Sequence, residues 1–505
     1  MGAGVGGLCA AIRAATGDRP VVLLERADRV GGKMRLVDDI DAGPTVLTMR
    51  WAFERLFASA GRALEDYVQL EVLDILARHA WADGSQVDLF ADIERSAAAF
   101  ERFTSAADAE GYRRFCAYTE RIFATVEGPF LRAERPSVSS IVTAQGLRGA
   151  MAFARIDWHR SMWRSLGTFF TDPRLRQLFG RYATYYGSSP FRAPATLNLI
   201  AHVERDGVWR PRGGMYALAA ALERLARELG VEIRTRTEVE EITVGPDRRA
   251  SGVWLRTKAG PRAHLEAAAV IVNAAPQALD EGHFGPALAG CVGLRRDRPR
   301  SLSAVTWTMK ARTRGFDLAH HNVFFSSDYP AEFRALERGE LPGEPTVYVC
   351  AQDRLPGIQN HGRDPCDLSQ GERLLILVNA PARGDERDPA GDPACGPWSE
   401  RALEILEAST FALMHRCGLD IEREGVAVTR TTPGDFEALF PASGGALYGF
   451  ATHSMMAPFQ RPAARTRIGG LYLAGGGTHP GAGVPMVCLS GQLAGSAALE
   501  DLEMP

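Results

Sequence analysis

The chain opens with MGAGVGG at residues 1–7, and this short stretch decides the class of fold. Its glycines follow the pattern G-x-G-x-x-G, which is weak evidence by itself because glycine-rich turns are common. The neighbouring sequence strengthens it: residues 8–16 have a helix-forming composition, and residues 20–24, PVVLL, predict an apolar strand. That strand ends at Glu25, 18 positions after the last glycine of the pattern, which is typical of a dinucleotide-binding βαβ unit.

Each part of this pattern has a physical role in holding a dinucleotide. Glycines let the backbone approach the pyrophosphate, and the N-terminus of the following helix supplies N–H donors. Glu25 is expected to accept hydrogen bonds from the adenosine ribose and to repel a 2′-phosphate. The alternative is a glycine-rich turn with a surface glutamate. We therefore predict a Rossmann-like unit whose cofactor-binding glycines are Gly2, Gly4 and Gly7.

Such a unit also needs a β-strand directly before its first glycine, because that strand directs the turn at the pyrophosphate. Only Met1 precedes Gly2 in this sequence. A domain would hardly tolerate the loss of a central strand, so we expect the natural chain to begin about six to twelve residues upstream, with an apolar run that ends at Gly2.

The residues after Glu25 distinguish flavin from nicotinamide binding. A second glycine pair, Gly31-Gly32, follows six residues later, which is unusual for NAD enzymes and typical of a large superfamily of FAD-dependent oxidoreductases. Residues 41–45, DAGPT, could run along the ribityl chain, although a purely structural turn is an equal alternative. From this part of the chain we assign to the FAD site Arg26, Gly32, Lys33, Arg35, Pro44 and Thr45.

A second glycine-rich segment lies near the C-terminus. Residues 470–474, GLYLA, predict a strand, and GGGTHPGAG at residues 475–483 leads to Pro485, which suits the first turn of a helix. The N-terminus of that helix could stabilise the negative charge of a reduced flavin. A strand expected at residues 237–242 returns to the same sheet, where the backbone of Val239 faces the adenine or simply ends the strand. These segments add to the FAD site Val239, Gly475, Gly476, Pro485 and Met486.

The composition bounds the class of protein. The chain has 505 residues, of which 46% are hydrophobic and 24% charged, and this is ordinary for a globular protein. Its net charge of -3 argues against nucleic-acid binding. We see no leader and no apolar run of about 18 residues, and therefore expect a cytoplasmic protein without a membrane span. The eight cysteines show no metal spacing, so we expect buried thiols and no metal site, with His320 and His321 included in that prediction.

Because nucleotide-binding signatures occur at both ends and in the middle, the nucleotide domain is expected to be discontinuous. We predict an α/β fold in which a Rossmann-like FAD-binding domain carries inserted helical and mixed-sheet substrate domains. Residues 181–190, RYATYYGSSP, have an aromatic density that suits either the wall of an isoprenoid site or a buried helix. The expected boundaries are 1–65, 206–289 and 436–505 for the FAD-binding domain, 66–205 for the helical region and 290–435 for the substrate domain.

Several longer stretches resemble a known family. They are ERADRVGGKMR at 25–35, DAGPTVLTM at 41–49, GVWRPRGGMYALAAAL at 207–222, FPASGGALYG at 440–449 and LYLAGGGTHPGAGVPM at 471–486. With them the sequence resembles the bacterial carotenoid desaturases of the phytoene-desaturase type over nearly its whole length. The variant Val484-Pro485-Met486 and residues 183–190 are similar to the branch of photosynthetic bacteria that desaturates 1-hydroxycarotenoids at C-3,4.

The resemblance implies an FAD-dependent reaction. FAD would accept a hydride at N5 from an allylic C–H of the carotenoid, a proton would leave the neighbouring carbon, and a quinone or O2 would reoxidise the flavin. The polyene delocalises positive charge, so a strong base is not required. Asp157, His159 and Arg160, in the stretch RIDWHRSMW, are the candidates for catalytic polar groups near the substrate, and a solvated helix face is the alternative.

A carotenoid substrate also implies contact with a membrane. Passing about 20 carbons through water would cost on the order of 16 kcal/mol, which favours direct uptake from the bilayer. We therefore expect a peripheral protein on the inner (photosynthetic) membrane, attached through an apolar patch of residues 66–205. Phe169, Phe170, Phe179 and Tyr182 either contribute to that patch or pack in the core.

Other functions remain open at this point. Within the same family the alternatives are a phytoene desaturase and a carotenoid isomerase. Outside it they are a flavin amine oxidase, against which the segment Thr-His-Pro-Gly-Ala-Gly at 478–483 argues, and a non-redox FAD-binding protein.

Overall fold

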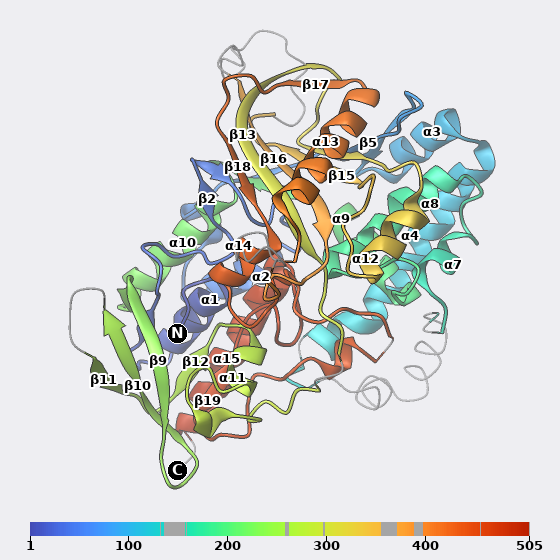
Figure 1. The fold of residues 1–505 in the computed structure, drawn as a ribbon. Coiled ribbons are helices and arrows are strands. Elements are labelled where there is room, and N and C mark those ends of the chain that lie inside the picture. Colours follow the sequence, from blue (N-terminus) through green and yellow to red (C-terminus); the bar gives the residue numbers. More distant parts are fainter. Residues whose placement is uncertain are drawn as a thin grey trace.

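The structure is a computed structural model, and Figure 1 shows a nucleotide-binding region, a large mixed sheet and a group of helices. Strands β9 to β12, β19 and helices α1 and α15 lie in the lower part of the view, the large sheet above them, and α3, α4, α7 and α8 to one side. The residues that the structure describes are 1–131, 133–135, 157, 159–257, 262–295, 298–354, 371–387, 397–454 and 456–503.

The nucleotide-binding region is assembled from distant segments, as expected. Strand β1 pairs with β8 in parallel, and β12 pairs with β19 in parallel. The first residues of the chain lie between the two pairs: Gly2 N donates to Leu24 O at 2.7 Å, and Asn273 N donates to Met1 O at 2.9 Å. Residues 1–3 thus stand where the central strand of a dinucleotide-binding unit is needed. The elements are α1 (Val5–Ala15), β1 (Val22–Leu24), α10 (Tyr216–Glu228), β8 (Glu232–Arg234), β12 (Val270–Val272), α11 (Pro276–Asp280), β19 (Leu471–Leu473) and α15 (Val484–Glu503).

Smaller elements complete this region. Helices α1 and α15 pack so closely that a Cβ at Gly491 would lie 2.3 Å from Gly6 O. Only glycine therefore fits at the crossing. The antiparallel sheet β11-β10-β9 extends from the region's edge (Figure 1). The remaining elements are β2 (Leu36–Val37), β3 (Ile40–Asp41), α2 (Trp51–Ser59), β9 (Thr237–Val244), β10 (Ala250–Thr257), β11 (Ala263–Glu266) and α14 (Pro433–Leu439).

The large mixed sheet has the strand order β17-β13-β16-β15-β14-β5-β6, with β18 also paired to β13. Strand β5 runs parallel to β14, with Arg78 opposite Asn322. One face of the sheet packs on α13 through Phe324, Val347 and Val349. The opposite face packs on the helical region. The elements are β5 (Ile75–Ala80), β6 (Gln86–Phe90), β13 (Ser303–Gly315), β14 (His321–Phe324), α12 (Tyr329–Glu337), β15 (Val347–Ala351), β16 (Glu372–Ala380), α13 (Glu400–Arg416), β17 (Leu419–Glu422) and β18 (Val428–Thr431).

The prediction that residues 66–205 form a helical region needs correction at its start. Residues 75–90 are the hairpin β5–β6, which belongs to the large sheet. The turn between the strands is Asp83-Gly84, in which Gly84 has a positive φ of 83° and Asp83 Oδ1 accepts a hydrogen bond from Ser85 N at 2.9 Å. An Asp-Gly pair between alternating strands is a strong hairpin signal, and the helix-rich composition around it concealed it.

The helical region is held together by aromatic side chains. Phe170, Phe179 and Tyr182 are at most 1% exposed, and the rings of Phe170 and Phe179 stack with centroids 4.8 Å apart. Core packing is therefore the correct interpretation of these three side chains, and Phe169 packs partly buried against the same core; a membrane patch elsewhere in residues 66–205 stays a prediction. No helix of the described residues has both the length and the apolar character to cross a bilayer. The elements are β4 (Leu70–Val72), α3 (Ile93–Phe103), α4 (Ala106–Val126), α7 (Met162–Leu166), α8 (Pro173–Gly180), α9 (Leu199–Arg205) and β7 (Trp209–Pro211).

Candidate functional site: a glycine cradle and a polar cavity

The glycine turn at the start of α1 leaves no room for side chains. A Cβ at Gly7 would lie 1.9 Å from Gly2 O, and a Cβ at Gly4 would lie 2.9 Å from the amide nitrogen of Asn273. The second glycine pair packs directly on this turn, with Gly31 N donating to Ala3 O at 2.8 Å and Gly32 against Gly4. Gly4 is the N-cap of α1 and remains partly exposed, and the N-terminus of a helix is a place where a pyrophosphate is stabilised.

Glu25 lies where its place in the sequence predicts, at the end of β1 beside the glycine turn. Its carboxylate is 9% exposed and accepts hydrogen bonds from Ala3 N at 2.7 Å and Ala27 N at 2.8 Å. A carboxylate can accept about four hydrogen bonds, so Glu25 can still accept one from each of two ribose hydroxyls. Arg26 points elsewhere: its guanidinium donates to Ala438 O and Leu439 O at the end of α14, and its contact with the cofactor stays a prediction.

The two other basic residues assigned to the cofactor turn toward the segment before the C-terminal strand. Lys33 Nζ donates to Leu447 O at 2.9 Å and Ala446 O at 3.2 Å, and burial lowers the pKa of this amine to about 8. Arg35 donates to Thr431 Oγ1 at 3.0 Å. Burial lowers its pKa as well, because desolvation disfavours the charged form. Both side chains have partners within the protein, and their contact with a cofactor stays a prediction.

The C-terminal glycines meet the N-terminal glycine turn through Asn273. A Cβ at Gly475 would lie 2.5 Å from Asn273 Oδ1, and a Cβ at Gly6 would lie 3.1 Å from Gly475. Gly475 N donates to Ser490 Oγ at 3.1 Å, and Gly476 O accepts from Arg461 at 2.8 Å. The structure thus brings the two glycine-rich ends of the chain together. The sequence predicts this meeting, but it does not identify Asn273 as the link.

Three further residues assigned to the cofactor are buried near this cradle, whereas Pro44 and Thr45 are half-buried in the loop of residues 41–45. Pro485 and Met486 lie in the first turn of α15, and Val239 lies in β9 with 8% exposure in the same apolar core as Leu24. Two helix N-termini, a buried carboxylate and glycines without room for a Cβ form a donor and acceptor set that fits the ribose and pyrophosphate of a dinucleotide cofactor. We call this arrangement the glycine cradle.

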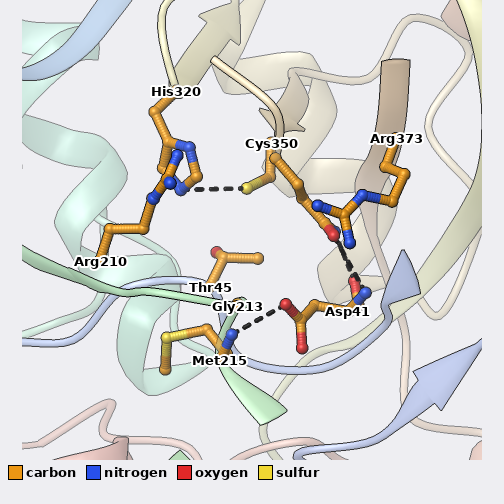
Figure 2. A pocket seen from close by; sticks show the side chains of 10 residues that line it. Asp41, Thr45, Arg210, Gly213, Met215, His320, Cys350 and Arg373 are labelled. Atoms are coloured by element: carbon orange, nitrogen blue, oxygen red, sulfur yellow. Dashed lines mark hydrogen bonds between the residues drawn. The ribbon is translucent and has the colours of Figure 1, made fainter. Parts of the chain in front are cut away.

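A second feature lies where the loop of residues 41–45 meets the large sheet (Figure 2). Asp41 caps α10 by accepting hydrogen bonds from Met215 N and Tyr216 N, both at 2.8 Å. The side-chain amide of Gln352 fixes the same loop to β15 through the backbone of Asp41, at 2.8 and 3.0 Å. Between loop and sheet is a cavity of about 40 Å³, lined by Asp41, Thr45, Arg210, Gly213, Gly214, Met215, His320, Cys350, Gln352 and Arg373.

The prediction that His320 and His321 take part in no metal constellation is wrong, because Cys350 joins them in one cluster of donor atoms. Cys350 lies opposite His321 in the register of β14 and β15, so one donor atom from each of His320, His321 and Cys350 lies within 4.8 Å of the others. Burial, with a smaller contribution from nearby Arg210, lowers the pKa of His320 to about 4, so this imidazole is neutral. The positive charge of Arg210 opposes a cation at this cluster, whereas the neutral state of the imidazole does not.

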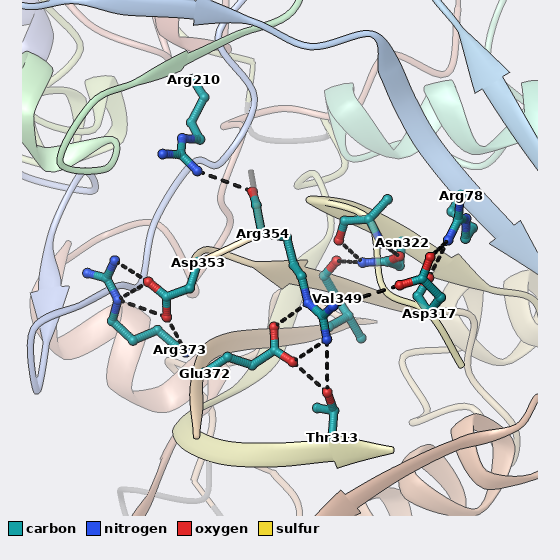
Figure 3. Close-up of polar contacts among 11 residues, drawn as sticks. Arg78, Arg210, Thr313, Asp317, Asn322, Val349, Asp353, Arg354, Glu372 and Arg373 are labelled. Carbon is teal, nitrogen blue, oxygen red and sulfur yellow. Dashed lines mark hydrogen bonds and ion pairs between the residues drawn. The ribbon is translucent and has the colours of Figure 1, made fainter. Parts of the chain in front are cut away.

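The two arginines that line the cavity already have acidic or carbonyl partners (Figure 3). Arg373 forms a bidentate contact with Asp353, whose carboxylate oxygen lies 2.6 Å from the guanidinium. Arg210 donates to Arg354 O at 3.2 Å and pairs with Glu71 at 3.3 Å. These contacts hold the two guanidinium groups in the wall of the cavity. Because both groups already have protein partners, neither is reserved for an anionic ligand.

The predicted catalytic residues come together in part. Arg160 contacts both carboxylate oxygens of Asp157, at 2.7 and 2.5 Å, whereas the His159 side chain is 63% exposed and lies 3.9 Å from Asp157. Tyr118 and Ser165 also donate to Asp157, each at 3.3 Å. Burial raises the pKa of Asp157, but the hydrogen bonds from Arg160 and Tyr118 and the nearby positive charge together outweigh it, and the pKa is lowered. Such a carboxylate is a weak base, so the geometry favours an ion pair that orders the segment; substrate contact stays a prediction.

A glycine cradle beside an inserted mixed sheet defines an α/β oxidoreductase that binds a nucleotide cofactor. Residues 5–307 match the family model of the flavin containing amine oxidoreductases, and the chain belongs to this family. The family implies a flavin cofactor.

Within this family the chain is similar over its full length to carotenoid desaturases. It is 45% identical to a hydroxyneurosporene desaturase of Rubrivivax gelatinosus, over 100% of this chain and 93% of the relative. It is 40% identical to the hydroxyneurosporene desaturase of Cereibacter sphaeroides, over 99% of this chain and 97% of the relative. An oxidoreductase from Methanosarcina mazei shares the fold, with a TM-score of 0.57, 14% identity and 97% of each chain covered.

Proposed function

We propose that this chain is an FAD-dependent desaturase that introduces a C-3,4 double bond into acyclic carotenoids carrying a 1-hydroxy or 1-methoxy group, such as 1-hydroxyneurosporene. The observation that carries the proposal is the full-length similarity to hydroxyneurosporene desaturases. The glycine cradle supports it, because its buried carboxylate and two helix N-termini fit FAD.

The residues of the cradle would do the binding. The backbone around Gly4 and Gly475 approaches the pyrophosphate, and Glu25 holds the ribose. FAD, when bound, supplies the acceptor for the hydride that leaves the carotenoid. Cys350 and Thr45 line the polar cavity at the place where the nucleotide-binding region meets the large sheet.

The substrate and the reoxidation partner follow from the same proposal. A carotenoid partitions into a bilayer, so the protein would act as a peripheral protein on the inner (photosynthetic) membrane and take its substrate from the lipid. A quinone or O2 would accept the electrons from the reduced flavin.

One incubation tests the proposal against its alternatives. The purified chain is combined with FAD, 1-hydroxyneurosporene in liposomes and a quinone, and the product is analysed by mass and absorption spectra. We expect a loss of two hydrogens and a red-shifted spectrum. A rearranged product of unchanged mass indicates an isomerase, and a gain of oxygen indicates an oxygenase.

The specificity is tested in parallel. Conversion of phytoene, without any action on 1-hydroxyneurosporene, would place the chain among the phytoene desaturases. Oxidation of a primary amine with release of hydrogen peroxide would make it an amine oxidase. Reactions without added FAD, after removal of bound flavin, serve as the control.

A further inference from the structure

A series of hydrogen bonds runs from the predicted cofactor loop into the buried face of the large sheet. Thr45 Oγ1 lies 2.7 Å from the hydroxyl of Tyr348, and that hydroxyl lies 2.7 Å from Nδ1 of His321. Tyr348 and His321 come from neighbouring strands, β15 and β14, and their side chains are on the same face. The series, which we call the Thr45–Tyr348–His321 relay, therefore links the segment assigned to FAD with the interior of the sheet.

The far end of this relay has no partner among the described residues. His321 is 3% exposed, and its buried Nε2 makes no hydrogen bond within that part of the chain. A donor atom of the same ring lies within 4.8 Å of Cys350 and His320, which line the polar cavity. A buried polar nitrogen without a partner is uncommon in folded proteins and indicates a ligand atom or a bound water.

One arrangement of protons in the relay gives His321 a donor for a ligand. Burial and the nearby His320 and Arg181 keep the pKa of His321 well below its usual value, so the imidazole is neutral. A neutral imidazole carries one N–H. When Tyr348 donates to Nδ1 and Thr45 donates to Tyr348, the proton of His321 is at Nε2, and the ring presents an N–H donor.

We propose that His321 Nε2, held in this orientation by Tyr348 and Thr45, binds the oxygen atom on C-1 of the carotenoid. This inference rests on the proposed function and deepens it. The oxygen of a 1-hydroxy or 1-methoxy group is only a few bonds from the C-3,4 bond. A group that binds this oxygen must therefore lie close to the flavin, and the relay begins at a loop assigned to the flavin. Tyr348 is a positioning residue, whereas His321 contacts the substrate.

The chemistry explains a preference for oxygenated substrates. A hydroxyl and a methoxy oxygen both accept a hydrogen bond from an N–H donor, so both substrates pair with His321. A carotenoid without this oxygen leaves the buried N–H unpaired, and a site built for a polar group rejects such an analogue more strongly than an apolar pocket would. His321 thus distinguishes one atom of an otherwise apolar molecule.

The experiment compares two substrates that differ in that atom, 1-hydroxyneurosporene and 1,2-dihydroneurosporene, with 1-methoxyneurosporene as a third. Binding to the flavin-loaded protein in detergent micelles is measured by quenching of tryptophan fluorescence, and turnover and KM are measured separately. For the parent we expect the oxygenated carotenoids to bind roughly 10-fold more tightly or better than the dihydro compound. In His321→Leu this ratio should fall to about 1, mainly through Kd and KM.

Further variants separate recognition from simple structural damage. His321→Gln retains a donor near the position of Nε2 and should keep a preference, and Tyr348→Phe should lose most of it with the flavin content unchanged. Tyr329→Phe is the matched control, because its hydroxyl is also buried without a partner among the described residues but lies on α12 outside the relay. A parent ratio near 1, or a ratio unchanged in both His321→Leu and Tyr348→Phe, overturns the inference. If the parent does not desaturate any of the three carotenoids, the proposed function fails instead.

Discussion

The glycine cradle and the buried sheet face that carries the Thr45–Tyr348–His321 relay differ in how their polar groups are satisfied. In the cradle the protein itself satisfies the polar groups: Glu25 already has two backbone donors, and Asn273 joins the glycine-rich ends. At the buried sheet face, His321 Nε2 and Arg181 Nε have no partner within the described residues. The cradle would hold its proposed cofactor mainly through close backbone approach and Glu25. At the sheet face the proposed ligand would complete the hydrogen bonds, and such a requirement gives specificity.

The strongest test of this contrast removes space from the cradle. In Gly7→Ala the new Cβ would lie 1.9 Å from Gly2 O, so the turn must open. We expect a loss of about 3 kcal/mol in the free energy of unfolding and almost no copurified flavin. Flavin absorbance and urea unfolding measure the two effects. Gly343→Ala is the control, because nothing lies within 4 Å of a Cβ there. Normal flavin content in Gly7→Ala would contradict a cradle made by close backbone packing.

Charge in the cradle is tested at Glu25. Glu25→Ala removes the acceptor of Ala3 N and Ala27 N together with the expected ribose contacts, and should weaken FAD binding by roughly 3 kcal/mol. Glu25→Gln keeps the shape with a weaker acceptor and should lie between the alanine variant and the parent. The dissociation constant is measured by flavin fluorescence. If the alanine variant holds FAD as tightly as the parent, this residue does not contact the ribose.

On the helical side of the large sheet, Glu332 predicts a dependence of stability on pH. Burial raises the pKa of this carboxyl to about 7, against hydrogen bonds from Thr346 and Ser326. The folded protein keeps the proton to a higher pH than the unfolded chain, so stability falls as the pH rises from about 4.5 to 7 and then stays low. Glu332→Gln should remove this fall and be about 2 kcal/mol more stable than the parent at pH 8, with no advantage at pH 4. Urea unfolding of both proteins at pH 4 and pH 8 measures the difference in the free energy of unfolding and its sign.

The smallest effect is expected at Asp157. Its pKa is lowered through Arg160, so its stabilising contribution is present above its usual pKa of 3.8 and is lost as the pH falls through the folded value. Asp157→Asn should cost about 1 kcal/mol at pH 7, since Arg160 is 38% exposed and partly screened, and almost nothing at pH 2. Arg160→Gln should have the same cost at pH 7. Urea unfolding measures these costs. Turnover that drops by roughly two orders of magnitude in Asp157→Asn, with stability unchanged, would instead make Asp157 catalytic.

The sequence predicts those structural features that depend on a few contiguous residues. The glycine turn, the strand that ends at Glu25 and the helix after residue 483 all lie within a few positions of their expected places. Each of these features is a local backbone requirement, which a single glycine or carboxylate indicates. The expectation of a strand before Gly2 follows from the same local rule. The structure places residues 1–3 between β1 and β12, at the position of that strand, and the expectation of residues upstream stays a prediction.

The Thr45–Tyr348–His321 relay could not be predicted in this way. Thr45, His321 and Tyr348 meet because β14 and β15 are neighbours and the loop of residues 41–45 is fixed to β15, and sheet register leaves no signal in one sequence. The same limit explains why the sequence does not predict that Cys350 lies beside His320. It also explains why the sequence leaves two locations open for Phe170 and Phe179, since an aromatic side chain has the same composition signal in a core and on a membrane surface.

The parallel pairing of β5 with β14 has a consequence for how the protein is made. About 240 residues separate Ala80 from His321, so a ribosome needs roughly 10 to 50 s to supply the partner after the hairpin β5–β6 has emerged. During this interval the edge of β5 that will pair with β14 is an open template for other strands. Folding of this protein during synthesis therefore includes an interval in which β5 lacks its partner strand. A chaperone that covers residues 75–90 during this interval would raise the yield of folded protein.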